Sequence, residues 1–432
     1  MITALMEDVA SLLARGRKAA QSNQLDEALA LFRRIVELDP AHAEAHDTLG
    51  AIFLHRGDPA AAVRHCEQAV LASPDQIVLH QHLGGAHNQL LRSPRATAEL
   101  AAICDELPRA FVSRLHLGRL REHAKDDRGA LISYTRAVQT AQVHGFWTSE
   151  TSTPPWLRAQ VAHAIAVMRR GRAELFADWM RGAERAHGAS EMKRVAKALA
   201  MYLGTEPTVY ADPRQKPSFL YFPDLPIAPV FPRDALDFAD WYEASWEAIR
   251  DEALAVHEGI QPFHYDVPEE RRAALTRGDW DAYFFYDEGS RIEEHHAACP
   301  RTSAILDRLP LDHVRDHGPE WCFSIMRPGA HILPHRGVTN TRSVLHLGLV
   351  IPPGCALDLV GVQEVSWEPG RCFAFDDTYE HQAWNRSGET RFVLLGDIWN
   401  PYLTPPERLA VADLVATIGD WNRATSAIKP PA

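Results

Sequence analysis

Small side chains recur every 34 residues through the first third of this chain. One column of the repeat is glycine, a second is alanine, and a large or apolar side chain follows each alanine by four residues. The columns are Gly16, Gly50, Gly84 and Gly118; Ala28, Ala62, Ala96 and Ala130; and Phe32, Cys66, Leu100 and Tyr134. A fourth column is Pro40, Pro74 and Pro108, with Gln142 in the last repeat. Four columns in one register predict a repeat architecture, in which each unit buries its apolar face against its neighbours.

The columns are typical of paired helices. Small residues let two helices approach closely, the bulky residue fills the remaining gap, and proline ends the second helix. In the second repeat, residues 49–53 read LGAIF and residues 62–66 read AVRHC, followed by Pro74, and this resembles the tetratricopeptide repeat. The resemblance covers residues 8–142, where we expect four repeats in an α-helical solenoid. It implies that the concave face can recruit a peptide.

The composition changes twice after the repeats. Residues 155–204 keep helical periodicity, and we expect helices there that cap the solenoid. Seven prolines then fall within residues 205–233, which predicts an extended linker between domains. Residues 234–432 should form the second domain, which opens with one helix over 234–256, because aromatic and aliphatic residues follow helical spacing there.

Short apolar runs separated by Pro-Gly and Ser-Gly turns follow residue 280. Many short strands at regular spacing predict a double-sheet β sandwich or jelly roll, a class that includes the cupin-type roll. The expected strands are Tyr283–Tyr286, Cys322–Met326, Ser343–Ile351, Ala356–Val360, Glu364–Trp367, Cys372–Phe375, Gln382–Asn385 and Phe392–Trp399.

Charge and composition narrow the partners and the compartment. The 432 residues include 45 Lys and Arg against 57 Asp and Glu, a formal net charge of −12, with no long basic run. This argues against a nucleic acid or an anionic membrane as the main partner. No run approaches the roughly 18 apolar residues of a spanning helix, and the start lacks the basic region of a secretory signal. Six scattered cysteines without a CxxC motif suit a reducing compartment, so we expect a cytoplasmic protein.

Three residues suggest a metal and acid site in the second domain. His335 ends a short apolar strand, His381 opens another, and Arg391 begins the run that follows. Two imidazoles on facing strands can ligate one divalent metal, and imidazole suits iron, zinc, copper and nickel alike. A buried arginine can hold a carboxylate with two hydrogen bonds, so the set meets the requirement for 2-oxoglutarate. The usual third ligand of iron, a carboxylate two residues after the first histidine, is absent because Gly337 stands there.

Two sequence blocks in this region resemble a known family. Residues 335–340 read HRGVTN and residues 375–381 read FDDTYEH, and the similarity extends over about 217–403. These blocks resemble the aspartyl/asparaginyl β-hydroxylases, which are Fe(II)- and 2-oxoglutarate-dependent oxygenases on a double-stranded β-helix. That family has glycine in place of the ligating carboxylate, and Gly337 matches the gap.

The resemblance implies roles for five residues. His335 and His381 match the two iron ligands. Arg391 matches the residue that pairs with the distal carboxylate of 2-oxoglutarate. Ser324 matches a hydroxyl that also contacts this cosubstrate, and His346 matches an imidazole near its other carboxylate.

Other polar residues near the motifs receive different interpretations. His331 would lie too far from His335 along an extended strand to share its metal. Asp376 and Asp377 precede His381, so we expect a supporting or turn role for them rather than ligation. Val344 stands where a substrate-facing arginine is expected, which leaves the substrate open.

The leading hypothesis is therefore an Fe(II)- and 2-oxoglutarate-dependent dioxygenase. It would use O2 to hydroxylate a C–H bond on an Asp- or Asn-type residue of a peptide or protein that the solenoid recruits. A second hypothesis is hydroxylation of a free amino acid or of a small, carrier-bound metabolite. A third is a non-catalytic tetratricopeptide scaffold that carries a metal-binding roll.

Overall fold

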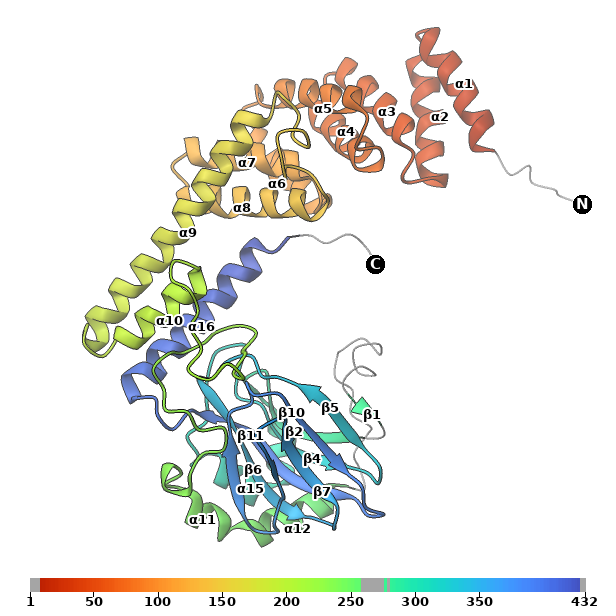
Figure 1. Cartoon of the computed structure of the whole chain (residues 1–432). Helices are drawn as coiled ribbons and strands as arrows, with labels where there is room; N and C mark the ends of the chain where they lie inside the picture. Colours follow the sequence, from red (N-terminus) through yellow and green to blue (C-terminus); the bar gives the residue numbers. More distant parts are fainter. Residues whose placement is uncertain (1–7, 258–275, 278–279, 428–432) are drawn as a thin grey trace, which may run out of the picture. The chain divides into compact units, whose positions relative to one another are not determined.

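The computed structural model describes residues 8–257, 276–277 and 280–427. The chain divides into two compact units, one made of residues up to 175 together with those from 421, and one made of residues 176–420. The long helix α9 (Arg158–His187) carries the chain from the first unit into the second (Figure 1). Within the described residues, no helix has the length and apolarity needed to cross a membrane.

The first unit is helical, as the repeat columns predict. Neighbouring helices pack in pairs, such as α1 on α2, α3 on α4, and α7 on α8. The helices before α9 are α1 (Val9–Gln21), α2 (Leu25–Leu38), α3 (Ala43–His55), α4 (Pro59–Ala72), α5 (Ile77–Leu90), α6 (Ala96–Glu106), α7 (Phe111–His123) and α8 (Asp127–Val143).

Three of the four column glycines lie where the two helices of a repeat touch, whereas Gly84 faces Trp156. A Cβ atom on Gly50 would lie 2.6 Å from the Cys66 sulfur, and one on Gly118 would lie 2.7 Å from the Tyr134 ring. Both distances are shorter than a carbon side chain tolerates, so glycine permits this close approach. The spacing of 16 residues between glycine and its bulky partner therefore reflects direct contact within a repeat.

Residues 155–204 form two helices, and they pack in different places. At the start of α9, Val161 and Ala164 are buried in the core of the first unit. In α10 (Lys193–Leu203), Val195 and Ala198 are instead buried with residues of the second unit such as Phe222. The expected capping role therefore does not describe α10, because an apolar stripe shows that a helix is covered without showing by what.

The second unit is built on two antiparallel sheets, as expected for a double-stranded β-helix. The five-stranded sheet has the order β1-β5-β10-β7-β8, and the six-stranded sheet has the order β3-β2-β4-β11-β6-β9 (Figure 1). The strands are β1 (Thr276–Arg277), β2 (Trp280–Asp287), β3 (Ser290–Arg291), β4 (Trp321–Met326), β5 (His331–His335), β6 (Arg342–Val350), β7 (Cys355–Leu359), β8 (Gln363–Val365), β9 (Cys372–Phe375), β10 (His381–Asn385) and β11 (Arg391–Trp399).

Apolar alternation gives the six-stranded sheet two different faces. Leu345, Leu347 and Leu349 of β6 lie in one core, where helices α11 (Ala239–Glu243), α12 (Trp246–His257) and α15 (Pro300–Leu306) cover the sheet (Figure 1). The opposite face contributes residues such as Val393 to a second core, which it shares with the five-stranded sheet. The candidate site residues of β6 and β11 belong to this inner face.

The prediction of a single helix over residues 234–256 is wrong. A short 3-10 turn, η1 (Arg233–Ala235), precedes α11 and α12, and the chain breaks between these two helices. Glu243 ends α11, and its carboxylate accepts a hydrogen bond from the Cys372 backbone N–H and pairs with Arg233 and Arg371. Three helices, α14 (Glu293–Ala298), α15 and α16 (Pro405–Thr425), were not expected from the sequence.

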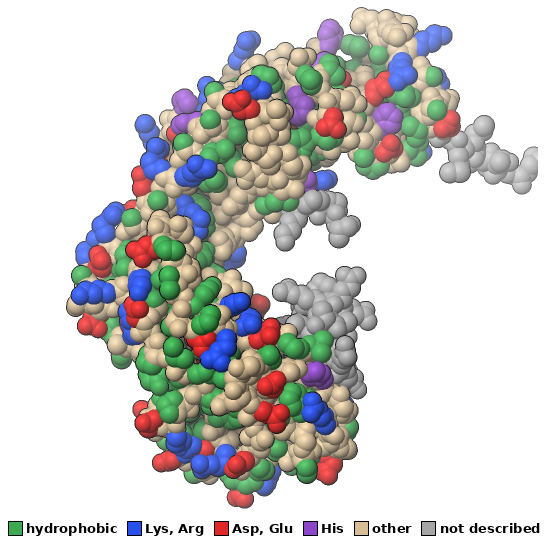
Figure 2. Space-filling view, in the orientation of Figure 1, with side chains coloured by type: hydrophobic (Ala, Val, Ile, Leu, Met, Phe, Trp, Pro, Cys, Tyr) green, Lys and Arg blue, Asp and Glu red, His purple; other side chains and the backbone are tan. Residues whose placement is uncertain are grey.

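The surface carries both signs of charge. On the face drawn in Figure 2, Lys and Arg side chains are interspersed with Asp and Glu side chains. This distribution agrees with a net charge of −12 spread over many acidic and basic residues.

Candidate active site

The two candidate ligands meet between neighbouring strands. His335 ends β5 and His381 begins β10, where they are direct antiparallel partners with ring centroids 4.1 Å apart. Each ring donates from Nδ1 to the carbonyl two residues earlier, His335 to Leu333 at 2.8 Å and His381 to Tyr379 at 2.9 Å. A carbonyl only accepts, so the proton is on Nδ1 and the lone pair on Nε2, which is the form of imidazole that binds a metal.

Burial keeps both rings neutral. It lowers the pKa of His335, and together with the neighbouring His335 it lowers the pKa of His381 to about 3. Desolvation disfavours the charged imidazolium in each case. Both Nε2 lone pairs are therefore present at neutral pH.

Gly337 has no room for a ligating carboxylate. A Cβ atom there would lie 2.0 Å from Oδ2 of Asp377, so the Asp377 carboxyl fills the space beside the glycine. The Oδ1 atom of Asp377 has no hydrogen-bond partner within the described part of the chain, and burial raises the pKa of this carboxyl to about 8. The described residues contain no group of three or more His, Cys, Asp or Glu side chains that could hold a metal, so His335 and His381 stand as a pair.

Arg391 is a buried cation with spare donors. It begins β11, is 1% exposed, and lies with its guanidinium carbon 4.8 Å from the centre of the Trp367 ring. Its Nη1 lies a long 3.5 Å from both the carbonyl and the hydroxyl oxygen of Ser324, and its Nε has no partner in the described structure. Burial lowers the pKa of Arg391 to about 10, so it stays charged at neutral pH. A buried charge without a counter-ion is costly, so this fork is suited to a bound carboxylate.

Two tryptophans orient the remaining polar groups. The Trp280 indole donates to the Ser324 hydroxyl at 2.9 Å. The Trp367 indole donates to Nδ1 of His346 at 2.9 Å, and the two rings are nearly parallel. Burial, and then the charge of Arg391, hold the pKa of His346 well below its usual range. The neutral ring therefore carries its proton on Nε2, where it can serve as a donor.

All five predicted residues border one interior between the sheets. Ser324, His346 and Arg391 lie on the six-stranded sheet, and the two paired histidines lie on the five-stranded sheet. The Phe375 ring connects the sets, with centroids 5.1 Å from His381 and 5.4 Å from His346.

Sequence reasoning missed the tryptophans and left some charged residues open. Trp367 was visible only as the tryptophan of a W-x2-G motif, although a buried indole N–H needs a partner. Arg342 forms a largely buried ion pair with Asp397 at 2.7 Å. His331 bonds to Gln382 at 2.9 Å and stays outside the histidine pair.

Comparison with family models matches both units. Residues 243–401 match the model of the aspartyl/asparaginyl beta-hydroxylases. This match lies within the second unit. Residues 19–81 match a tetratricopeptide repeat model, in agreement with the glycine and alanine columns.

Curated relatives match the hydroxylase domain over part of their length. Human aspartyl/asparaginyl beta-hydroxylase is 36% identical over 167 residues, which cover 38% of this chain and 21% of that protein. Rat aspartate beta-hydroxylase domain-containing protein 2 is 32% identical over 230 residues, covering 51% and 65%. Ornithine lipid ester-linked acyl 2-hydroxylase of Rhizobium tropici is 32% identical over 190 residues, covering 43% and 66%. The chain thus spans from about a fifth to about two thirds of the length of these relatives.

Proposed function

We propose that this protein is an Fe(II)- and 2-oxoglutarate-dependent dioxygenase that hydroxylates a C–H bond of an Asp- or Asn-type residue in a peptide or protein. The observation that carries the proposal is the buried guanidinium of Arg391, whose Nε has no hydrogen-bond partner among the described residues, in the same interior as two imidazoles with Nε2 lone pairs. The names of the relatives, all hydroxylases or proteins with a hydroxylase domain, support the same reaction type.

His335 and His381 would hold the iron through Nε2, and the Asp377 carboxyl fills the space beside Gly337. Bound Fe(II) supplies the activation of O2 and the oxidation of the C–H bond. Arg391 and Ser324 would bind the distal carboxylate of 2-oxoglutarate, and Nε2–H of His346 would donate to the other carboxylate. Trp367, Phe373 and Phe375 surround His346 and keep water away from this part of the interior.

One observation favours a second candidate substrate. Val344 is on the same face of β6 as His346, so an apolar side chain stands where a cation would select an acidic substrate. The Rhizobium relative is named for hydroxylation of an acyl chain. A free amino acid or a small, carrier-bound metabolite is therefore the alternative substrate for the same reaction.

The test is an anaerobic titration of the full chain with Fe(II) and then 2-oxoglutarate, followed by visible absorption. A weak metal-to-ligand charge-transfer band is expected, and His381→Ala should abolish it. The matched control is His331→Ala, which removes an imidazole from the same strand as His335 and should leave the band unchanged.

Two results would overturn the proposal. If folded protein with confirmed metal occupancy gives no band, the roll does not bind 2-oxoglutarate on iron. If the band forms but no succinate appears in air with peptide or small-molecule candidates, the scaffold hypothesis takes its place. Cytoplasmic location remains a prediction, which cell fractionation can check.

A further inference from the structure

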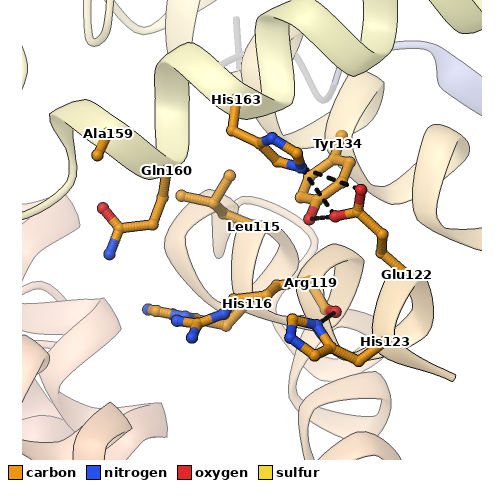
Figure 3. Close-up of a pocket in the computed structure, with 9 residues that line it drawn as sticks. All are labelled: Leu115, His116, Arg119, Glu122, His123, Tyr134, Ala159, Gln160 and His163. Atoms are coloured by element: carbon orange, nitrogen blue, oxygen red, sulfur yellow. Dashed lines mark hydrogen bonds and ion pairs between the residues drawn. The ribbon is translucent and has the colours of Figure 1, made fainter.

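A pocket of about 490 Å³ lies within the first unit, and none of its lining residues belongs to the proposed hydroxylase site. It is lined by side chains from α7, α8 and the start of α9. Figure 3 shows Gln160 and His163 of α9 on one side and Leu115, His116 and Arg119 of α7 on the other. The volume falls within the range of small-ligand sites, and it suits one or a few amino-acid side chains.

The carboxylate of the acidic residue in this pocket is already hydrogen-bonded to its neighbours. Glu122 accepts a hydrogen bond from the Tyr134 hydroxyl at 2.7 Å and contacts Nε2 of His163 at 2.8 Å (Figure 3). Burial opposes ionisation of Glu122, but these two hydrogen bonds outweigh it and lower the pKa. Glu122 therefore does not offer a free negative charge to a ligand.

Two other side chains of the pocket, His116 and Arg119, lack such partners among the residues that the structure describes. His116 is 4% exposed, and neither of its ring nitrogens has a hydrogen-bond partner among the residues that the structure describes. Its ring lies between those of His87 and Trp156, with centroids 4.6 and 6.5 Å away. Arg119 is exposed beside it and makes no ion pair in the described structure. A buried polar group without a partner is costly, so His116 points to a ligand that completes its hydrogen bonds.

We propose that this pocket binds the side-chain carboxylate of an Asp or Glu residue in a partner peptide. Arg119 pairs with the carboxylate, a ring N–H of His116 donates to it, and Leu115 and Ala159 contact the methylene groups. A cationic side chain would meet the charge of Arg119, and a purely apolar one would leave His116 without a partner. The pocket would therefore be the part of the solenoid that recognises an acidic side chain of the partner peptide.

The test uses full-length protein and a positional-scanning library of acetylated, amidated heptapeptides immobilised on a surface. The wild-type chain should enrich Asp or Glu at one position. Arg119→Gln should weaken binding of the enriched peptides roughly tenfold or more, because it removes a charge-assisted hydrogen bond. His116→Phe, which keeps a flat ring against Trp156, should also weaken them.

Arg128→Gln is the matched control. Arg128 is exposed at the start of α8 and does not line the pocket, so its replacement removes the same charge elsewhere on the unit. The proposal is overturned if the wild type shows no acidic preference, or if Arg128→Gln weakens binding as much as Arg119→Gln. This test involves no metal or cosubstrate, so its outcome is independent of the proposed hydroxylase activity.

Discussion

Each unit holds two imidazole rings in close contact, and the two pairs differ in their hydrogen bonds. The centroids of His335 and His381 are 4.1 Å apart, and those of His87 and His116 are 4.6 Å apart. Burial lowers the pKa of all four rings. Proximity and burial alone therefore do not distinguish a metal site from a packed helical core.

The distinction lies in what holds each ring. His335 and His381, which we call the β pair, each donate from Nδ1 to a backbone carbonyl. Both rings of the pair therefore have their lone pair on Nε2. In the helical pair, His87 uses Nδ1 with the Leu83 carbonyl and Nε2 with the Ser113 hydroxyl, whereas His116 uses neither nitrogen. The strand backbone fixes the same tautomer in both rings of its pair. In the helical core, both ring nitrogens of His87 already have hydrogen-bond partners.

The largest expected effect is on 2-oxoglutarate dependence, and it follows from replacing Arg391, the arginine in the same interior as His335 and His381. Arg391→Ala should raise the 2-oxoglutarate concentration for half-maximal succinate formation about thirtyfold or more, since losing one partner of a buried charge pair costs roughly 2–5 kcal/mol. Arg119→Gln should leave this concentration unchanged. If the wild type and Arg391→Ala depended equally on 2-oxoglutarate, the residues around His335 and His381 would not differ in function from those around His87 and His116.

The glycine beside the β pair gives the next effect. Gly337→Ala should lower the free energy of unfolding by about 1–3 kcal/mol, because the new methyl group overlaps the Asp377 carboxyl. In the Asp377→Ala background the same change should cost much less. Urea unfolding of the four proteins measures this coupling, and an equal cost in both backgrounds would show that Asp377 does not fill the space.

A pH effect of similar or smaller size is expected in the helical core. Glu67 is fully buried, and burial raises its pKa to about 7, against roughly 4.3 for an unfolded carboxyl. Between these values the folded state keeps a proton that the unfolded state has lost, so stability should fall as pH rises from about 4.3 to about 7, by roughly 1–3 kcal/mol. Glu67→Gln should flatten this dependence in urea unfolding at pH 5 and pH 7.5. An unchanged slope in the variant would assign the pH dependence to other groups.

The smallest effect concerns the indole that orients His346. Trp367→Phe removes one hydrogen bond worth about 1 kcal/mol, so the half-saturating 2-oxoglutarate concentration should rise about fivefold. Trp384→Phe is the control, because Trp384 contacts His331 outside the site. The same rise in both variants would indicate general loosening of the roll.

Local patterns predicted the elements better than their partners. The spacing from Gly118 to Tyr134 reports a contact within one repeat, and the strands of the roll follow residues that alternate between two faces. At the end of α11, Glu243 forms an ion pair with Arg371, which is distant in sequence. The packing of α10 likewise depends on a surface that forms only when the second unit folds.

In the candidate site, too, residues marked by a local pattern could be predicted, whereas contacts between distant segments could not. His335, His381 and Arg391 stand out because each lies at the end of an apolar run. The residue that fills the space beside Gly337 could not be assigned, because the motif holds both Asp376 and Asp377 and only the turn before His381 determines which one points there. No spacing rule connects Trp367 to His346, since their contact forms across the roll.

The pairing of His335 with His381 across β5 and β10 links metal affinity to strand register. Successive side chains of a strand point to opposite faces, so a slip of one residue would turn one imidazole away from the other. A chain that has joined these strands incorrectly could be compact and still bind no iron. If the proposed site binds iron, the fraction of refolded molecules that regain the metal would count the molecules in which β5 and β10 have paired correctly, and iron would be a probe of folding accuracy.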